Sequence, residues 1–265
     1  MTHAERQAAL EAIAGEIRVC TACRLHEGRT NAVPGEGNAS TEVMFVGEGP
    51  GFNEDRLGRP FVGRAGELLV RLLGSIGWRR DEVFITNVVK CRPPENRDPE
   101  PDEIAACAPF LRRQLEILDP ALVVTLGRHS MARFMPGARI SAAHGTLRPA
   151  DPATGVRDGL VFAMYHPAAA LRTPAIERTS HEDVAAVPAA LLEARRLRAE
   201  HEAAAQPPAL AQLPVQPEPA AAATVAVAEI AVAEIAVAEP VPAGRAEPAL
   251  AVAEGDDPTD QLSLF

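Results

Sequence analysis

The chain lacks any long apolar run. None of its 265 residues lies in a stretch that is long and apolar enough to span a membrane. The sequence opens with Met-Thr-His-Ala-Glu-Arg and leads into a charged helical pattern instead of the apolar segment of a secretory signal. We therefore expect a cytoplasmic protein, in a reducing compartment where disulfide bonds are rare.

Lysine is also scarce and occurs only once, at Lys90. The net charge of -10 by itself would argue against nucleic acid as a partner, but the charge is unevenly distributed along the chain. Residues 201–265 hold ten acids and one base, which leaves 26 acids and 25 bases in residues 1–200. That nearly neutral part is rich in arginine, which suits phosphate contacts, although a GC-rich genome would also favour arginine.

The composition changes near residue 200. From residue 206 onward proline, alanine and valine dominate, and Ala-Val-Ala-Glu-Ile recurs with a period of five that fits neither helix nor strand. We expect one domain over residues 1–200, a disordered acidic linker over residues 201–260, and a separate short peptide at residues 261–265.

Helical and strand patterns alternate before residue 200. Helices are predicted over residues 4–19, 64–76, 101–118 and 181–198, and buried strands over residues 43–46, 83–89, 121–126 and 160–165. This order predicts an α/β fold with a central four-stranded parallel sheet flanked by helices. Ligand sites in such sheets lie beyond the carboxyl ends of the strands.

Cysteine is limited to four residues. Cys20 and Cys23 form a C-x-x-C pair, whereas Cys91 and Cys107 are single residues separated by fifteen others. A four-thiolate zinc site usually draws on two close pairs, while an iron–sulfur cluster tolerates isolated cysteines better. The spacing alone leaves zinc and iron–sulfur evenly matched, with disulfides a weaker third alternative in a reducing cytosol.

Glycine-rich and polar motifs follow the predicted strands. Their order is Gly-Glu-Gly-Pro-Gly at 47–51, Gly-Arg-Pro-Phe-Val-Gly-Arg-Ala-Gly at 58–66, Thr-Asn-Val-Val-Lys-Cys-Arg-Pro-Pro at 86–94 and His-Pro at 166–167. Glycines this dense let the backbone approach a ligand closely. Together with the four cysteines, these motifs closely resemble the family 4 uracil-DNA glycosylases over residues 15 to 200.

Members of that family have the α/β uracil-glycosylase fold, carry a [4Fe–4S] cluster and hydrolyse the N-glycosidic bond of uracil in DNA. The resemblance implies that this chain is a base-excision repair enzyme with its cluster on Cys20, Cys23, Cys91 and Cys107. We expect a monomer, associated with the nucleoid, that acts on single-stranded or double-stranded DNA. A family relative that traps uracil covalently needs a histidine in the loop matching residues 92–103, which has none, so turnover is favoured over trapping. A damage-binding protein without turnover remains a further alternative.

The resemblance also assigns the residues that contact uracil. Phe61 stacks on the base, Asn87 pairs with its N3–O4 edge, and His166 donates to O2 as charge grows on the departing base. Cytosine presents the opposite hydrogen-bonding pattern to an Asn amide. The plainer interpretation makes Phe61 a core residue and Asn87 a turn cap. The remaining candidates His129, His144 and His181 are expected to be loop or surface histidines.

The residue that handles the attacking water is less well defined. Family 1 glycosylases have an aspartate in the first motif, whereas the aligned residue here is Gly49. Gly49 cannot activate water, and we expect it to contact the substrate instead. Glu48 is the nearest carboxylate, with Asp55 and Glu54 as alternatives that could orient water or stabilise an oxocarbenium-like sugar. Glu48 could instead only hold its own loop in place.

Two further segments are expected to reach DNA or its partners. Leu171 is a candidate minor-groove wedge and Arg172 a candidate phosphate contact, although Ala168 stands where relatives carry serine. The last five residues resemble the peptide with which bacterial repair proteins dock on the sliding clamp. In that comparison the binding residues are Gln261, Leu262, Leu264 and Phe265.

Overall fold

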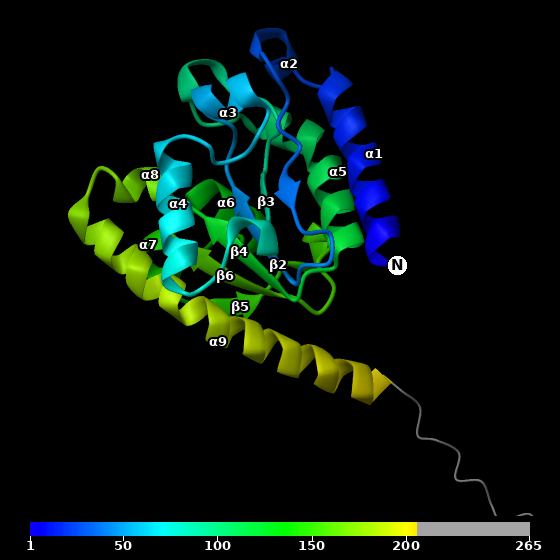
Figure 1. Cartoon of the computed structure of the whole chain (residues 1–265), viewed down its shortest axis with the longest axis vertical. Coiled ribbons are helices and arrows are strands. Elements are labelled where there is room, and N and C mark those ends of the chain that lie inside the picture. Colours follow the sequence, from blue (N-terminus) through cyan, green and yellow to red (C-terminus); the bar gives the residue numbers. More distant parts are fainter. Residues whose placement is uncertain (206–265) are drawn as a thin grey trace, which may run out of the picture. The chain divides into compact units, whose positions relative to one another are not determined.

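The computed structural model describes residues 1–205, which form an α/β unit with helices on both faces of one sheet (Figure 1). The predicted linker beyond residue 205 and the peptide at residues 261–265 lie outside the described residues. The strands are β1 (Glu36–Gly37), β2 (Val43–Gly47), β3 (Phe84–Asn87), β4 (Leu122–Leu126), β5 (Leu147–Pro149) and β6 (Leu160–Met164). The helices are α1 (His3–Val19), α2 (Leu25–Gly28), α3 (Phe52–Leu57), α4 (Arg64–Ser75), α5 (Pro101–Leu118), α6 (Arg128–Phe134), α7 (Ile140–Ala143), α8 (Pro167–Ala170) and α9 (Pro174–Ala205).

The sheet has the strand order β1-β3-β2-β4-β6-β5. Its four inner strands run parallel, which confirms the predicted four-stranded parallel sheet. The short strands β1 and β5 add an antiparallel edge on each side. They were not predicted, because segments of two or three residues carry no measurable periodicity.

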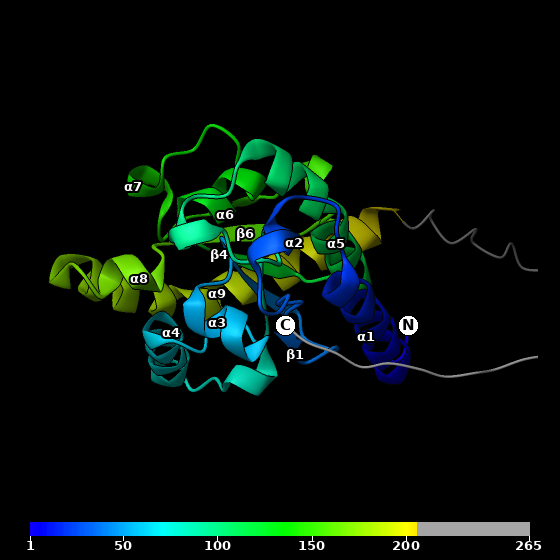
Figure 2. The same ribbon diagram turned by 90° about the horizontal axis from the view of Figure 1, so that it is seen from above.

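Alternate residues of β2 belong to two separate cores. Met44 and Val46 pack in the core that includes α1 and α5, whereas Val43 and Phe45 pack in the core that includes α4 and α9. This alternation follows from the two-residue period of a strand. Figures 1 and 2 show α1 and α5 side by side on one side of the sheet. The sheet is therefore buried on both faces, and its parallel strands direct their carboxyl ends to one edge.

The bounds of three of the four predicted helices agree with α1, α4 and α5 to within one residue, whereas those of the last helix differ, and the short helices α2, α3, α6, α7 and α8 were not predicted. Helix α5 begins at Pro101 and ends at Leu118, as predicted. Helix α9 begins at Pro174, earlier than the expected residue 181, because proline is well tolerated in the first turn of a helix. It also continues past the predicted domain boundary at residue 200. No helix within residues 1–205 has the length and apolar composition required to cross a bilayer.

Candidate active site and cysteine site

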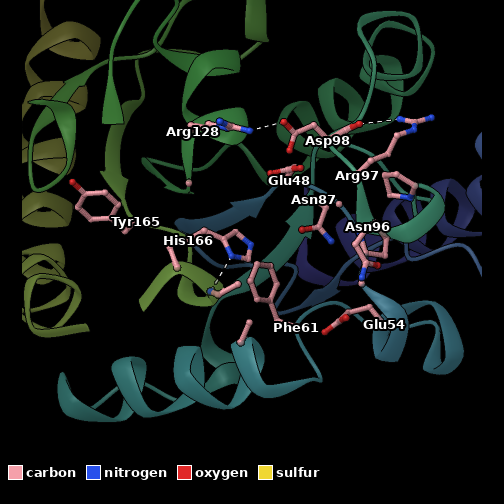
Figure 3. A pocket seen from close by; sticks show the side chains of 18 of the residues that line it. Glu48, Glu54, Phe61, Asn87, Asn96, Arg97, Asp98, Arg128, Tyr165 and His166 are labelled. Carbon is pink, nitrogen blue, oxygen red and sulfur yellow. Dashed lines mark hydrogen bonds and ion pairs between the residues drawn. The ribbon is translucent and has the colours of Figure 1, made fainter. Parts of the chain in front are cut away.

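A cavity of about 640 Å³ lies at the carboxyl ends of the parallel strands. Residues from the ends of β2, β3, β4 and β6 converge there, as expected for a parallel α/β sheet (Figure 3). The cavity brings together eight of the residues named in the sequence analysis: Glu48, Gly49, Glu54, Phe61, Asn87, His166, Ala168 and Arg172.

Asn87 is the last residue of β3, and only 1% of its surface is exposed. Within residues 1–205 its Oδ1 atom is buried without a hydrogen-bond partner. The opposite residue in the sheet is Gly47, where an added Cβ would lie 2.4 Å from Asn87 Oδ1 and 2.6 Å from Phe61 Cζ. The glycine therefore makes room for both side chains, and Asn87, which lines the cavity, keeps one unpaired buried acceptor.

Phe61 has a left-handed backbone with φ of 49° and is 6% exposed. Its ring centroid lies 5.7 Å from that of His166, with 30° between the ring planes. Arg80 Nη1 donates to the Phe61 carbonyl oxygen at 3.0 Å, and Arg80 also binds the Pro60 carbonyl. Glu36 pairs with Arg80 in turn. An unusual backbone conformation is thus held from outside the cavity, as expected at a functional site.

His166 follows β6 and is the N-cap of α8. The backbone N–H of Ala168 donates to His166 Nδ1 at 3.1 Å, so a neutral ring carries its proton on Nε2. Burial lowers the pKa of His166 to about 4, with a smaller opposing effect from Glu54. The imidazole is therefore neutral near pH 7 and has a free N–H donor.

Glu48 is half-buried at the cavity wall, and burial raises the pKa of its carboxyl group. His129 Nε2 lies 3.9 Å from Glu48 Oε2 and 3.2 Å from Asp98 Oδ2. Arg128 in turn pairs with Asp98 at 2.5 Å (Figure 3). His129, predicted to be a loop or surface residue, and Asp98, which stands in none of the sequence motifs, thus meet at the cavity. His129 comes three residues after β4 ends, so the same strand-end rule could have found it.

The other two carboxylates brace the backbone. Asp55 is buried and does not line the cavity; its Oδ1 accepts from the N–H groups of Thr30 and Asn31 at 2.8 and 3.3 Å. Glu54 lines the cavity, and its Oε1 accepts from the N–H groups of Val62 and Gly63 at 2.9 and 3.0 Å. Glu54 therefore secures the segment that follows Phe61.

The segment after His166 forms part of the cavity rim. Arg172 is exposed and lines the cavity, and its guanidinium forms no ion pair within the described chain. Leu171 is half-buried and packs against the core that includes α4 and α9. Leu171 is therefore partly exposed at the rim, and its role as a wedge stays a prediction.

A second, smaller pocket is lined by all four cysteines, Cys20, Cys23, Cys91 and Cys107. They come from the C-cap of α1, the following turn, the loop after β3 and the middle of α5. In this part of the chain all four are free thiols. Folding thus joins the C-x-x-C pair to the two isolated cysteines, as the sequence suggested.

The arrangement of the sulfurs tests which metal group would fit. Among residues 1–205, no three of the thiols have sulfurs all within 4.8 Å of one another, whereas four thiolates on one zinc ion would lie roughly 3.8 Å apart. N–H donors point at three of the sulfurs: Ala22 N at Cys20, Arg29 Nη1 at Cys91 and Lys90 N at Cys107. Burial raises the pKa of Cys107 to about 11, so this buried thiol ionises at neutral pH only if a cation such as a bound metal stabilises the thiolate. A wider group than a single ion, bound by thiolates that accept hydrogen bonds, fits these residues.

Comparison with known proteins gives a consistent result. A model of the uracil DNA glycosylase superfamily matches residues 34–189, which include every residue that lines the cavity. The chain is 50% identical over 186 residues to a type-4 uracil-DNA glycosylase of Saccharolobus solfataricus, covering 69% of this chain and 86% of the relative. A second, from Sulfurisphaera tokodaii, is 49% identical over 180 residues, or 66% of this chain and 81% of the relative. A third, from Thermotoga maritima, is 48% identical over 167 residues, or 63% and 85%.

Proposed function

This chain belongs to the type-4 uracil-DNA glycosylases of the uracil DNA glycosylase superfamily, and from that membership we propose how its cavity recognises and releases uracil. The chain is a DNA-repair enzyme that binds DNA and hydrolyses the N-glycosidic bond of uracil. The bond is inaccessible in a stacked strand, so the nucleotide must turn out into the cavity before reaction.

The observation that carries the proposal is the unpaired Oδ1 of Asn87. Uracil has a hydrogen on N3 and an oxygen at C4, so its edge satisfies Oδ1 and accepts from Nδ2 of the same amide. Cytosine has no hydrogen on N3 and carries an amino group at C4. It would leave the buried oxygen unpaired and set two donors against each other, which costs binding energy in a water-free site.

Phe61 and His166 complete the binding of the base. The Phe61 ring borders the cavity and offers a face on which uracil stacks. The Nε2 proton of neutral His166 donates to O2, where negative charge accumulates as the glycosidic bond breaks. Because that charge is larger in the transition state than in the ground state, the donor accelerates bond cleavage.

Glu48 is the carboxylate best suited to the sugar and the water. It borders the cavity, whereas Asp55 is engaged by the Thr30 and Asn31 amides. An ionised Glu48 attracts the cationic sugar and accepts a proton from water, and His129 at 3.9 Å favours that ionised form. Asp55 then acts as a brace for the loop that carries Glu54. Gly49 gives the base close backbone access, and Arg172 contacts a phosphate beside the rim segment of Leu171.

The four cysteines hold a [4Fe–4S] cluster, according to this proposal. The fit rests on their shared pocket, on sulfurs too widely spaced for one zinc ion, and on the N–H donors directed at them. When bound, the cluster supplies metal–sulfur bonds that join α1, the loop after β3 and α5. Excision needs no redox step, so the cluster acts by fixing the loop that follows Asn87.

The test of function is uracil release from excess uracil-containing DNA by anaerobically purified protein whose iron and sulfide are counted. We expect many free uracils per protein and about four iron and four sulfide per chain. A covalent protein–DNA adduct formed once per protein would identify a uracil trap. Binding without release would identify a damage-binding protein. Either result would overturn the proposal.

A separate proposal concerns residues 261–265, which lie outside the described residues. It rests on the sequence alone: Gln261, Leu262, Leu264 and Phe265 match a sliding-clamp peptide, and a monomer tethered by it would search DNA with the clamp. Deleting residues 261–265 should abolish clamp binding and leave excision from short oligonucleotides unchanged. Unaltered clamp affinity would refute it.

A further inference from the structure

Phe52 is the only exposed aromatic side chain among residues 1–205, with 58% of its surface open to solvent. It is the first residue of α3 and follows Gly51, which lines the cavity. Neither the sequence motifs nor the proposed mechanism gives Phe52 a role. Phe52 therefore offers an exposed aromatic face beside the cavity, on which another planar group can stack.

The Arg92 guanidinium lies over the Phe52 ring, with Cζ 5.2 Å from the ring centroid. Arg92 forms no ion pair with a carboxylate in the described chain, whereas its neighbour Arg97 pairs with Glu103 at 2.6 Å. Its charge is therefore available to an outside anion. A planar cation stacked on an aromatic ring offers both π-surface and positive charge to a ligand.

This pair is connected to the cavity through Asn96. Arg92 Nε donates to Asn96 Oδ1 at 2.7 Å, and Asn96 lines the cavity. Figure 3 shows Asn96 on the side of the cavity away from Tyr165. The surface made by Phe52 and Arg92, which we term the Phe52–Arg92 platform, thus continues directly from the cavity edge to solvent.

A nucleotide is the ligand with matching chemistry. When the uracil nucleotide occupies the cavity, the rest of the strand must pass over the cavity rim. The adjacent nucleotide then presents the face of one base and one phosphate to the surface there. We propose that the Phe52–Arg92 platform stacks the base adjacent to the excised uracil and that Arg92 contacts the phosphate between them. This inference rests on the proposed function, and it applies to DNA in which the strand is unpaired on at least one side of the lesion.

Any of the four bases can stack on an aromatic side chain, so the platform does not require a particular base next to the uracil. In duplex DNA the adjacent base stays stacked within its own helix. The platform therefore favours single-stranded over double-stranded substrates, because only the single strand gains a stacking partner that it lacked.

The experiment compares Phe52→Ala with Leu57→Ala, which removes another exposed apolar side chain from the same helix. On single-stranded uracil DNA, Phe52→Ala should raise KM at least about fivefold and leave kcat within about twofold of wild type. Phe52→Trp should restore KM. Leu57→Ala should behave as wild type.

Substrates with an abasic residue on one side of the uracil locate the stacked base. The wild-type protein should bind one of these two substrates more weakly than the intact strand. Phe52→Ala should bind that substrate and the intact strand equally well. If Phe52→Ala has the wild-type KM, or is as sensitive to the missing base as the wild-type protein, the platform does not stack the adjacent base.

Binding of uracil-free single strands, measured by fluorescence anisotropy, separates this inference from the proposed function. Weaker binding by Phe52→Ala than by Leu57→Ala supports the platform even if the wild-type protein releases no uracil. Equal binding by the two variants contradicts it even if excision is normal.

Discussion

Lys90 Nζ donates a hydrogen bond of 2.8 Å to the backbone carbonyl oxygen of Asn87. The only lysine of the chain is 1% exposed, and its ammonium also binds Thr86 Oγ1 at 2.6 Å and Gln114 Oε1 at 2.7 Å. Its own backbone N–H donates to Cys107 Sγ. One buried residue thus links the end of β3, α5 and the cysteine site, which fixes the backbone of the proposed uracil-binding residue.

Replacing Lys90 with methionine should therefore disturb recognition as well as stability. Three buried acceptors lose a donor, so the free energy of unfolding should fall by about 2 kcal/mol or more. The uracil KM should rise because Asn87 is less firmly held. Iron and sulfide content should stay at the wild-type level, since Lys90 is not a cluster ligand.

The matched control is Arg113→Met, which removes a cation from α5 whose partner is Glu16 on the surface. That variant should lose less than about 1 kcal/mol and keep its KM. Denaturant unfolding and steady-state kinetics measure both effects. A wild-type KM in Lys90→Met would show that the backbone of Asn87 needs no such support.

Two glycines of α4 should respond in opposite ways to alanine. At Gly66 an added Cβ would lie 1.9 Å from the Phe61 carbonyl oxygen, so Gly66→Ala must displace Phe61. At Gly74 nothing lies within 4 Å. We expect Gly66→Ala to lose about 1–3 kcal/mol and most of its uracil excision, and Gly74→Ala to gain up to about 1 kcal/mol. Thermal unfolding and excision rates check the pair, and equal activity in both variants would contradict the role of Phe61.

The fall in excision rate on the acid side of the pH–rate profile should reflect protonation of Glu48. Burial raises the pKa of Glu48 above its ordinary value of 4.5, so its active, ionised form is lost as pH falls through that raised pKa. His166 is already neutral there, because its pKa is about 4. Glu48→Gln should slow kcat by about a hundredfold or more and abolish the acid limb.

The same substitution should stabilise the fold. Burial makes the charged form of Glu48 unfavourable, and the native state therefore binds more protons than the unfolded state between the two pKa values. Stability is lost as pH rises through this window, and Glu48→Gln removes that loss at neutral pH. Glu67→Gln on the exposed face of α4 is the control. An acid limb that persists in Glu48→Gln would reassign the titrating group.

The sequence was sufficient for the sheet and for the strand-end residues. The parallel strands are apolar runs that are buried on both faces. Asn87 is the last residue of one such run, and Glu48 and His166 come one and two residues after the ends of two others. The position of a residue at the end of a strand can be read from the local sequence, and the motifs then indicated which of these residues contact uracil. The edge strands β1 and β5 were missed because they contain too few residues to show a pattern.

Other features depend on contacts between distant segments. Asp55 holds the amides of Thr30 and Asn31, about 25 positions earlier in the chain, and no local pattern reveals that partnership. Asp98 reaches His129 only because the loop after β3 passes close to the start of α6. Leu171 packs against the core that includes α4 and α9, a contact that its own segment of sequence does not reveal.

The recognition of uracil by Asn87 is tested most directly by the ratio of kcat/KM for uracil to kcat/KM for cytosine in DNA. Asn87→Asp replaces the Nδ2 donor with a second oxygen, which can accept from the cytosine amino group. Asn38→Asp, in a surface turn where Oδ1 accepts from Ser40 N, is the matched control. We predict that the ratio falls at least about a hundredfold in Asn87→Asp and is unchanged in Asn38→Asp. A wild-type ratio in Asn87→Asp would contradict the account.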